Sequence, residues 1–404
     1  MKLIEPRPIR EFALGIYDGP HATPKESTEG AVFLGIKNIT EDGQLDLSEI
    51  RYVSEEELPR WTRRVTPQLG DVVLTYEATL HRYAIIPEGF RGCLGRRVAL
   101  IRPNPKKADS RYLLYYFLSH EWRKVVEGYV TSGATVDRVP LEKFPEFPAV
   151  LPSIEAQRNI ADVLSAYDDL MENNRRRMGL LEDAARLLYQ EWFVRLRFPG
   201  HEHARLTQGI PEGWTTYTLD DLCLIGRGAS PRPIANFMDG EVAWFKIGDA
   251  TASESPYIFH TAEHVTDDGA KKSILLEPGA LILSNSATCG IPYFTGIRGC
   301  IHDGWLHFAN LKRISEQFLY CYLHFKRDEL VSSVGDGSTQ KNLNTSAVGR
   351  LKVVLPAHDS LLAQFEESVE PMFKMIFNLA RQNISLRAAR DLLLPRLMSG
   401  EIAV

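Results

Sequence analysis

The chain has 404 residues, of which 44% are hydrophobic and 25% are charged, and its formal net charge at pH 7 is −5. This composition is that of a globular protein with enough apolar residues for more than one core, so we expect two domains with connectors. A negative net charge argues against a protein that coats nucleic acid without sequence preference, because any DNA contact must then come from local basic patches.

The cysteines and the N-terminus indicate the compartment. The five cysteines are scattered without a Cys-x-x-Cys spacing, which predicts neither a disulfide framework nor a zinc site and fits a reducing cytoplasm. The start of the chain lacks the apolar core of a signal peptide, and no later stretch is long and apolar enough to span a bilayer. We therefore expect a soluble, cytoplasmic protein without membrane segments.

Four parts follow one another along the chain. Residues 1–150 contain short β-branched and aromatic runs such as Asp71–Tyr76, broken by Gly, Pro, Asn and Asp, which is typical of a mixed α/β domain rich in strands. Residues 151–200 have apolar positions three and four apart and predict a long amphipathic helix, which we expect to end at Arg197–Gly200. Residues 201–354 and 355–404 repeat the two patterns in the same order.

The two halves of the chain are an internal repeat. A shift of 204 residues (355 − 151) aligns Leu151-Pro152 with Leu355-Pro356 and Ala184-Ala185-Arg186 with Ala388-Ala389-Arg390. Upstream the shift becomes 209 (279 − 70), which matches Gly70–Thr75 with Gly279–Ser284. Further back, Gly19–Pro24 resembles Gly228–Pro231, and Val32–Ile36 resembles Ala243–Ile247. Glycines that recur in these segments, such as Gly19 and Gly228, are expected in turns.

The two helices are expected to pair. Two amphipathic helices in one chain bury their apolar stripes most simply against each other as a coiled coil, and the connectivity makes the pair antiparallel with a pseudo-twofold axis. Asn174 lies seven residues from both Tyr167 and Leu181 and is a candidate polar residue that sets the register of this seam. Trp192 and Phe193, near the helix end, are expected to pack against a globular domain. The predicted fold class is α+β, with two mixed α/β domains separated by the paired helices.

Three segments resemble the central and C-terminal conserved regions of the specificity (S) subunits of type I restriction-modification systems. They are Leu151–Ala161, Asn173–Arg177 through Glu191–Arg195, and Leu394–Ile402. The resemblance covers nearly the whole chain, strongly in the helices and more loosely in the globular parts. One departure is Leu361, where the repeat calls for a counterpart of Gln157, and it bears on the start of the second helix.

The resemblance implies that residues 1–150 and 201–354 are target recognition domains, each reading one half of a bipartite site in double-stranded DNA. The helices of residues 151–200 and 355–404 would set the spacer and dock two methyltransferase (M) subunits, and restriction (R) subunits would complete the complex. No phosphate loop, zinc-protease, esterase or adenine-methylation motif is present in the sequence, so we expect a non-catalytic subunit without a cofactor or metal of its own. His201-Glu202-His203 is interpreted as connector rather than a metal pair.

Polar and basic residues in the repeated turns are the candidates for DNA contact, because such side chains bond to base edges and phosphates. In the first domain they are His21, Lys37, Asn38, Arg63, Arg64, Thr75, Tyr76, Thr79, His81 and Arg82. In the second domain they are Arg227, Ser230, Arg232, Lys246, Ser284, Asn285, Thr288, Thr339, Gln340, Lys341 and Asn342. Any single one can be an ordinary turn residue, so the group carries more weight than its members. The run Asn173–Arg177 is either a solvated face or a contact to a partner or phosphate.

Two other functions remain open at this point. A coiled-coil assembly protein whose globular ends bind other proteins would have no salt-sensitive affinity for DNA. An enzyme with an unrecognised site, such as a modification enzyme that has kept only its recognition half, would transfer methyl groups as the isolated chain.

Overall fold

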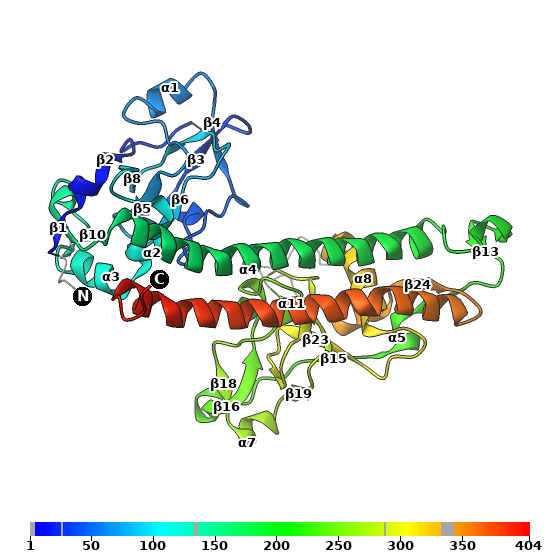
Figure 1. The fold of residues 1–404 in the computed structure, drawn as a ribbon. Helices are drawn as coiled ribbons and strands as arrows, with labels where there is room; N and C mark the ends of the chain where they lie inside the picture. The colour runs from blue at the N-terminus through cyan, green and yellow to red at the C-terminus, as the bar shows by residue number, and fades with distance from the viewer. Residues whose placement is uncertain (1–4, 26, 133–135, 287, 333–342) are drawn as a thin grey trace. The chain divides into compact units, whose positions relative to one another are not determined.

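The structure is a computed structural model that describes residues 5–25, 27–132, 136–286, 288–332 and 343–404. The chain forms two compact units, residues 1–170 with 386–404 and residues 171–385. Each unit therefore contains one globular part and a stretch of both long helices (Figure 1). In the described ranges no helix is both long and apolar enough to cross a membrane.

The first unit is built on two small sheets. One is antiparallel, in the order β2 (Ala13–Asp18), β8 (Val98–Pro103), β5 (Val72–Thr75) and β6 (Tyr83–Ile85). The other has the order β4 (Arg51–Val53), β3 (Ala31–Leu34) and β7 (Gly92–Leu94), with β3 and β7 parallel. Shorter elements are β1 (Arg7–Pro8) paired with β11 (Pro148–Ala149), β9 (Thr131–Ser132) paired with β10 (Asp137–Arg138), α1 (Leu58–Trp61), α2 (Ser110–Leu118) and α3 (His120–Glu127).

The second unit repeats this plan. Its larger sheet has the order β15 (Leu224–Arg227), β23 (Trp305–Ala309), β20 (Leu281–Ser284), β21 (Pro292–Thr295) and β17 (Tyr257–Ile258). Its smaller sheet has the order β18 (His264–Val265), β16 (Met238–Phe245), β22 (Gly299–Ile301) and β19 (Ile274–Leu276). Shorter elements are β12 (Leu206–Thr207) paired with β13 (Ile210–Pro211), β14 (Thr215–Thr218) paired with β24 (Lys352–Leu355), α5 (Leu219–Leu222), α6 (Ile247–Thr251), α7 (Asp267–Ala270), α8 (Glu316–Phe325), α9 (Arg327–Ser332) and α10 (Thr345–Gly349).

The internal repeat predicted from the sequence is confirmed in the strand register. In the first unit β3 runs parallel to β7 with Phe33 opposite Cys93, and in the second β16 runs parallel to β22 with Trp244 opposite Cys300. Both cysteines are fully buried, and burial raises the pKa of both thiols. The two cysteines therefore act as small apolar residues of equivalent cores.

Two long helices complete the units. The first, α4 (Ile154–Tyr189), is followed by a π-helical turn at Gln190–Val194, and the chain then leaves the helix at Leu196, which has a φ of 58°. The helix thus ends before the expected stop at Arg197–Gly200. The residues His201–His203, interpreted as connector, form an exposed 3-10 turn. The second long helix, α11, comprises Ser360–Met398.

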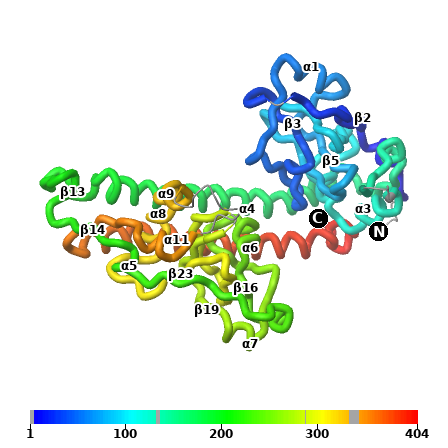
Figure 2. Tube along the Cα trace, turned by 180° about the vertical axis from the view of Figure 1, so that it is seen from behind, coloured from blue at the N-terminus to red at the C-terminus, as the bar shows by residue number. Residues whose placement is uncertain are grey.

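Within each unit the two helices run in opposite directions. In the second unit Asn174 contacts Asn383, whereas Tyr189, farther along α4, contacts Phe365, which lies near the start of α11. In the first unit Asp168 pairs with Arg390, and Leu397 lies in the same apolar cluster as residues 160–164 of α4. Figure 2 shows α8 beside α4 and α11 from behind. The expected antiparallel direction is therefore found in both units.

The aromatic residues at the end of α4 pack as predicted. Phe193 is buried, with ring centroids 4.9 Å from Phe318 of α8 and 6.0 Å from Trp214. Trp192 is partly buried and lies 5.9 Å from Phe365 of α11. The end of the first long helix is thus part of the core of the second globular part.

The departure at Leu361 has a structural explanation. In the first unit the Gln157 amide donates to the carbonyls of Lys107 and Pro152, both at 2.9 Å, and accepts from the backbone of Asp109 at 3.0 Å. Leu361 lacks an amide for these bonds. In the second unit Arg313 donates instead to the carbonyl of Pro356 at 2.7 Å.

Arg313 also pairs with Asp359 at 2.6 Å, which ties the loop before α8 to the start of α11. The carbonyl of Pro356 is the repeat counterpart of that of Pro152. The same backbone acceptor is therefore satisfied in both units, by a glutamine on the helix in one and by an arginine on the facing loop in the other.

Candidate DNA-recognition surface

Four loops meet at one end of the sheets in each unit, and we name them loops A to D. Loop A is residues 18–24 and 227–233, and loop B is residues 34–38 and 245–249. Loop C is residues 75–82 and 284–291, without residue 287, which lies outside the described ranges. Loop D is residues 95–98 and 302–305. They follow or join the strands β2, β3, β5 and β7 in the first unit and β15, β16, β20 and β22 in the second.

Loop D is bonded to the other three loops in the first unit. Val98 accepts from the backbone N–H of Gly19 in loop A at 2.9 Å, and Gly95 donates to Leu34 of loop B at 2.8 Å. Arg97 accepts from the backbone of Tyr76 in loop C at 3.3 Å. Loop D is therefore the centre of the cluster.

The second unit contains the same set of bonds. Trp305 accepts from Gly228 at 2.9 Å, His302 donates to Phe245 at 3.2 Å, and the backbone of Asn285 donates to Gly304 at 2.9 Å. A two-domain chain thus presents one four-loop cluster twice.

A glycine is required where loop A meets loop D. A Cβ on Gly19 would lie 2.4 Å from the carbonyl oxygen of Gly95, and a Cβ on Gly228 would lie 2.2 Å from that of His302. No side chain fits at such a distance, so this close backbone approach explains why the sequence repeat has glycine at both positions.

Most residues proposed from the sequence lie on loops A to C. Loop A carries His21, Arg227, Ser230 and Arg232; loop B carries Lys37, Asn38 and Lys246; loop C carries Thr75, Tyr76, Thr79, His81, Arg82, Ser284, Asn285 and Thr288. Arg63 and Arg64 follow α1, outside the loops, although Arg64 reaches loop A by pairing with Asp18. Thr339, Gln340, Lys341 and Asn342 lie outside the described residues.

The sequence reasoning missed loop D, which contributes Arg96, Arg97, His302 and Asp303. The available signal was the repeat of Gly92-Cys93-Leu94 as Gly299-Cys300-Ile301, which directly precedes loop D in both halves. Its shift of 207 (299 − 92) lies between the two shifts that organise the rest of the repeat. The signal was therefore present, but the charged residues that follow differ between the halves.

Several of the proposed residues are used inside the fold. Asn38 is buried; its amide accepts from Gly35 at 3.0 Å and donates to the carbonyls of Asp46 and Glu49 at 2.9 and 3.1 Å. Ser284 is also buried and bonds to Thr288 and Ile291. Such side chains shape the loops rather than extend from them.

In the first unit loop C contacts loop A and Glu41, which follows loop B in the chain. Tyr76 is fully buried, burial raises the pKa of its phenol, and its ring lies 6.5 Å from that of His21. His21 bonds to Asp18 at 3.0 Å. Arg82 pairs with Glu41 at 3.1 Å, and burial lowers the pKa of His81, which favours its neutral form at pH 7.

In the second unit Asp303 is the hub of the cluster. Its carboxylate accepts from Ser230 at 2.9 Å, lies 2.9 Å from the His302 ring and is 3.9 Å from the guanidinium of Arg232. Its backbone carbonyl accepts from the Arg227 side chain at 2.7 Å and from the Asn285 amide at 3.1 Å.

The charge state of this hub follows from its surroundings. Burial opposes ionisation of Asp303, but the bond from Ser230 and the neighbouring cations outweigh it, so that its pKa lies below the ordinary value. Burial lowers the pKa of His302, which is therefore neutral at pH 7. An ionised carboxylate thus contacts two of the side chains proposed for DNA contact, Ser230 and Arg232, and the Arg232 side chain is 76% exposed.

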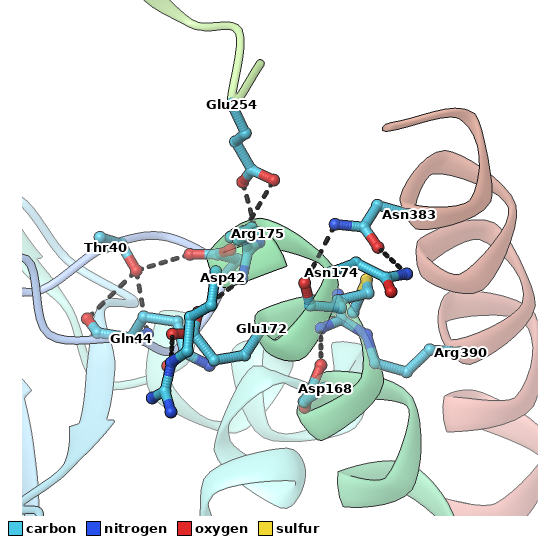
Figure 3. A network of polar contacts seen from close by, with 12 residues as sticks. Thr40, Asp42, Gln44, Asp168, Glu172, Asn174, Arg175, Glu254, Asn383 and Arg390 are labelled. Carbon is cyan, nitrogen blue, oxygen red and sulfur yellow. Dashed lines mark hydrogen bonds and ion pairs between the residues drawn. The ribbon is translucent and has the colours of Figure 1, made fainter. Parts of the chain in front are cut away.

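The polar run on α4 is partly engaged as well. Arg175 forms two bonds to Glu254 at 2.8 and 2.9 Å (Figure 3). Arg176 pairs with Glu172 at 2.9 Å. Figure 3 also shows Asn174 turned toward Asn383, to which it donates at 2.8 Å. Asn174 is fully buried, which confirms the predicted seam position.

Comparisons with known proteins are consistent with this double cluster. The family described as "Type I restriction modification DNA specificity domain" matches residues 30–182 and again residues 211–364. Each match contains loops B, C and D of one cluster, and together the matches cover most of the chain.

Individual relatives cover most of the chain. The "Type I restriction enzyme MjaIX specificity subunit" of Methanocaldococcus jannaschii is 26% identical over an alignment of 372 residues, which covers 88% of this chain and 82% of the relative. The "Type I restriction enzyme HindI specificity subunit" of Haemophilus influenzae is 21% identical over 75% of this chain and 80% of the relative.

A solved structure has the same fold. The crystal structure of a type I restriction-modification S subunit from M. genitalium aligns with a TM-score of 0.57 and 16% identity, over 98% of this chain and 97% of that one. Because the family match covers both halves of the sequence, the chain belongs to the type I restriction-modification DNA specificity family, the family of the S subunits.

Proposed function

We propose that this chain is the sequence-reading subunit of a type I restriction-modification complex, in which each globular part reads one half of a bipartite site in double-stranded DNA. Residues 1–150 and 201–354 are the two target recognition domains. The observation that carries the proposal is the four-loop cluster, because one chain presents the same surface twice with different side chains.

Different side chains on a repeated scaffold suit the reading of two different half-sites. Base edges are distinguished by the hydrogen-bonding groups that reach them, whereas the backbone of a loop determines only where those groups stand. The first cluster presents Arg96 at the position where the second presents Asp303. The two halves of the target would therefore differ in sequence.

The paired helices, residues 151–200 and 355–404, would act as an antiparallel coiled coil that sets the distance between the half-sites. A ruler needs one register, and the buried amide pair of Asn174 and Asn383 is suited to select it, because a shift would bury unpaired amides against apolar residues. The outer helix faces would dock two M subunits, and R subunits would complete the complex. In this assignment the chain carries neither catalytic residues nor a cofactor.

The test is methylome sequencing of cells that express this chain together with its methyltransferase subunit, compared with cells that express the methyltransferase subunit alone. A new bipartite adenine-methylation motif that depends on this chain is the expected result. If no motif appears and purified complex binds unrelated DNA sequences equally, the proposal fails, and an assembly role without DNA specificity is favoured.

A further inference from the structure

A basic hollow of about 730 Å³ lies beside the four-loop cluster of the first unit. Four cationic side chains line it, Lys37 of loop B, Arg51 of β4, and Arg96 and Arg97 of loop D, against one carboxylate, Glu49. The rest of the lining comprises three apolar side chains, Phe33, Ile36 and Ile50, together with Thr23, Gly35, Asn38 and Ser48. The hollow thus combines an excess of positive charge with a partly apolar wall.

The cations differ in how strongly they are already engaged. Arg97 donates to Glu77 at 2.8 Å, and Lys37 lies 3.9 Å from Glu49 as an exposed pair. Arg51 and Arg96 are both exposed, and within the described residues neither has an ion pair or a side-chain hydrogen bond. Two guanidinium groups are therefore available to an anion without breaking an internal contact.

The second unit reverses the charge at both matching positions. Val32 pairs with Tyr52 as Ala243 pairs with His264, so the residues that precede Tyr52 and His264, Arg51 and Glu263, are counterparts. In loop D the counterpart of Arg96 is Asp303, since Gly95 and His302 make the same backbone bond. Both acids are paired inside their own unit, Glu263 with Lys246 and Asp303 with Ser230.

We infer that the basic hollow of the first unit binds a backbone phosphate of the DNA, held chiefly by Arg51 and Arg96, and that the second unit does not contain this anchor. The inference rests on the proposed function. A guanidinium group can donate two parallel hydrogen bonds to the oxygens of one phosphate, and the apolar wall suits the sugar that adjoins the phosphate. A phosphate carries no sequence information, so this contact positions the first domain on the duplex without specifying a base.

The inference is tested on the full chain assembled with its methyltransferase subunit, by measuring the dissociation constant for target DNA over a range of salt concentrations. Loss of one phosphate contact lowers the slope of log affinity against log salt by about 0.9. We expect that loss in Arg51→Gln/Arg96→Gln, with affinity falling on the order of tenfold at low salt and an unchanged methylation motif. Arg60→Gln, an exposed cation of α1 outside the hollow, is the matched control.

A second measurement locates the contact on the DNA. Single phosphates of the target are replaced one at a time by neutral methylphosphonate. In the wild-type complex we expect one replacement within the first domain's half-site to cost the same affinity as the double substitution, and to cost nothing further in the double variant. Arg51→Lys/Arg96→Lys keeps both charges and should retain most of the salt slope.

The outcomes separate the two proposals. An unchanged slope and affinity in Arg51→Gln/Arg96→Gln would overturn the phosphate site, and so would a degenerate base in one half of the motif, which would make these residues base readers. Absence of any sequence preference in the wild-type complex would instead overturn the proposed function itself.

Discussion

Removing the charge of Asp303 is expected to disturb recognition far more than stability. Asp303→Asn keeps the size of the side chain but weakens the bonds to Ser230 and His302 and removes the attraction to Arg232, an exposed cation of the hub. The carboxylate is 36% exposed and the Arg232 pair is 3.9 Å apart, so this pair contributes less than about 1 kcal/mol to folding. Arg227 stays in place, because it donates to the backbone carbonyl.

Recognition depends on where loop A stands. If Ser230 or Arg232 reads a base, losing its placement costs about 1 to 3 kcal/mol per base contact, or roughly 5- to 150-fold in discrimination. In the methylome assay Asp303→Asn should give a motif that is degenerate in one half-site and unchanged in the other. Asp267→Asn, the same change at an exposed site of this unit, serves as the control.

The pH dependence provides an independent check on Asp303. Its pKa is lowered in the folded state, so its contribution to stability is present above the unfolded value and is lost as the pH falls through the folded value. Any difference in stability between wild type and Asp303→Asn should therefore be seen at neutral pH and vanish in acid.

In the methylome assay, a motif for Asp303→Asn that is identical to that of wild type in both half-sites, at full occupancy, would refute the hub role.

Three further predictions concern the helices. Asn174→Leu should lower the free energy of unfolding by about 1 to 3 kcal/mol, because the buried amide oxygen of Asn383 loses its donor. Asn174→Leu with Asn383→Leu should recover stability but broaden the spacer lengths in the methylome. Gln157→Leu should cost about 1 to 3 kcal/mol in chemical denaturation, because two partly buried carbonyls and one N–H lose their partner, whereas Leu361→Gln should be nearly neutral. Equal effects of the two substitutions would contradict the explanation of this departure. Burial raises the pKa of Glu182, so the ionised side chain destabilises the fold at pH values above its unfolded pKa. Glu182→Gln should therefore melt at a higher temperature than wild type at pH 7, with no gain near pH 4. A lower melting temperature at pH 7 would contradict this.

The sequence alone determined the plan of the molecule. Periodicity in a helix is local, so residues three and four apart revealed both long helices and placed Asn174 in their seam. The internal repeat can also be recognised in the sequence, and it predicted two related globular parts and most of the loops that form the cluster. The end of α4 was predicted too late, because the periodicity does not show that the α-helix gives way to a π-helical turn at Gln190–Val194, where Phe193 packs against Phe318 of α8.

Only the tertiary structure decided which residues act together. Loop D holds loops A, B and C through backbone bonds, and no side-chain pattern encodes such bonds. Arg51 and Glu263 are identified as equivalent positions from the strand register, which a shift along the sequence does not supply. Asn38 and Ser284 resembled contact residues because they are polar and lie in turns, yet burial commits both to holding loops. Register and burial are properties of the packed chain, and they separate the residues that shape the loops from those whose side chains extend from them.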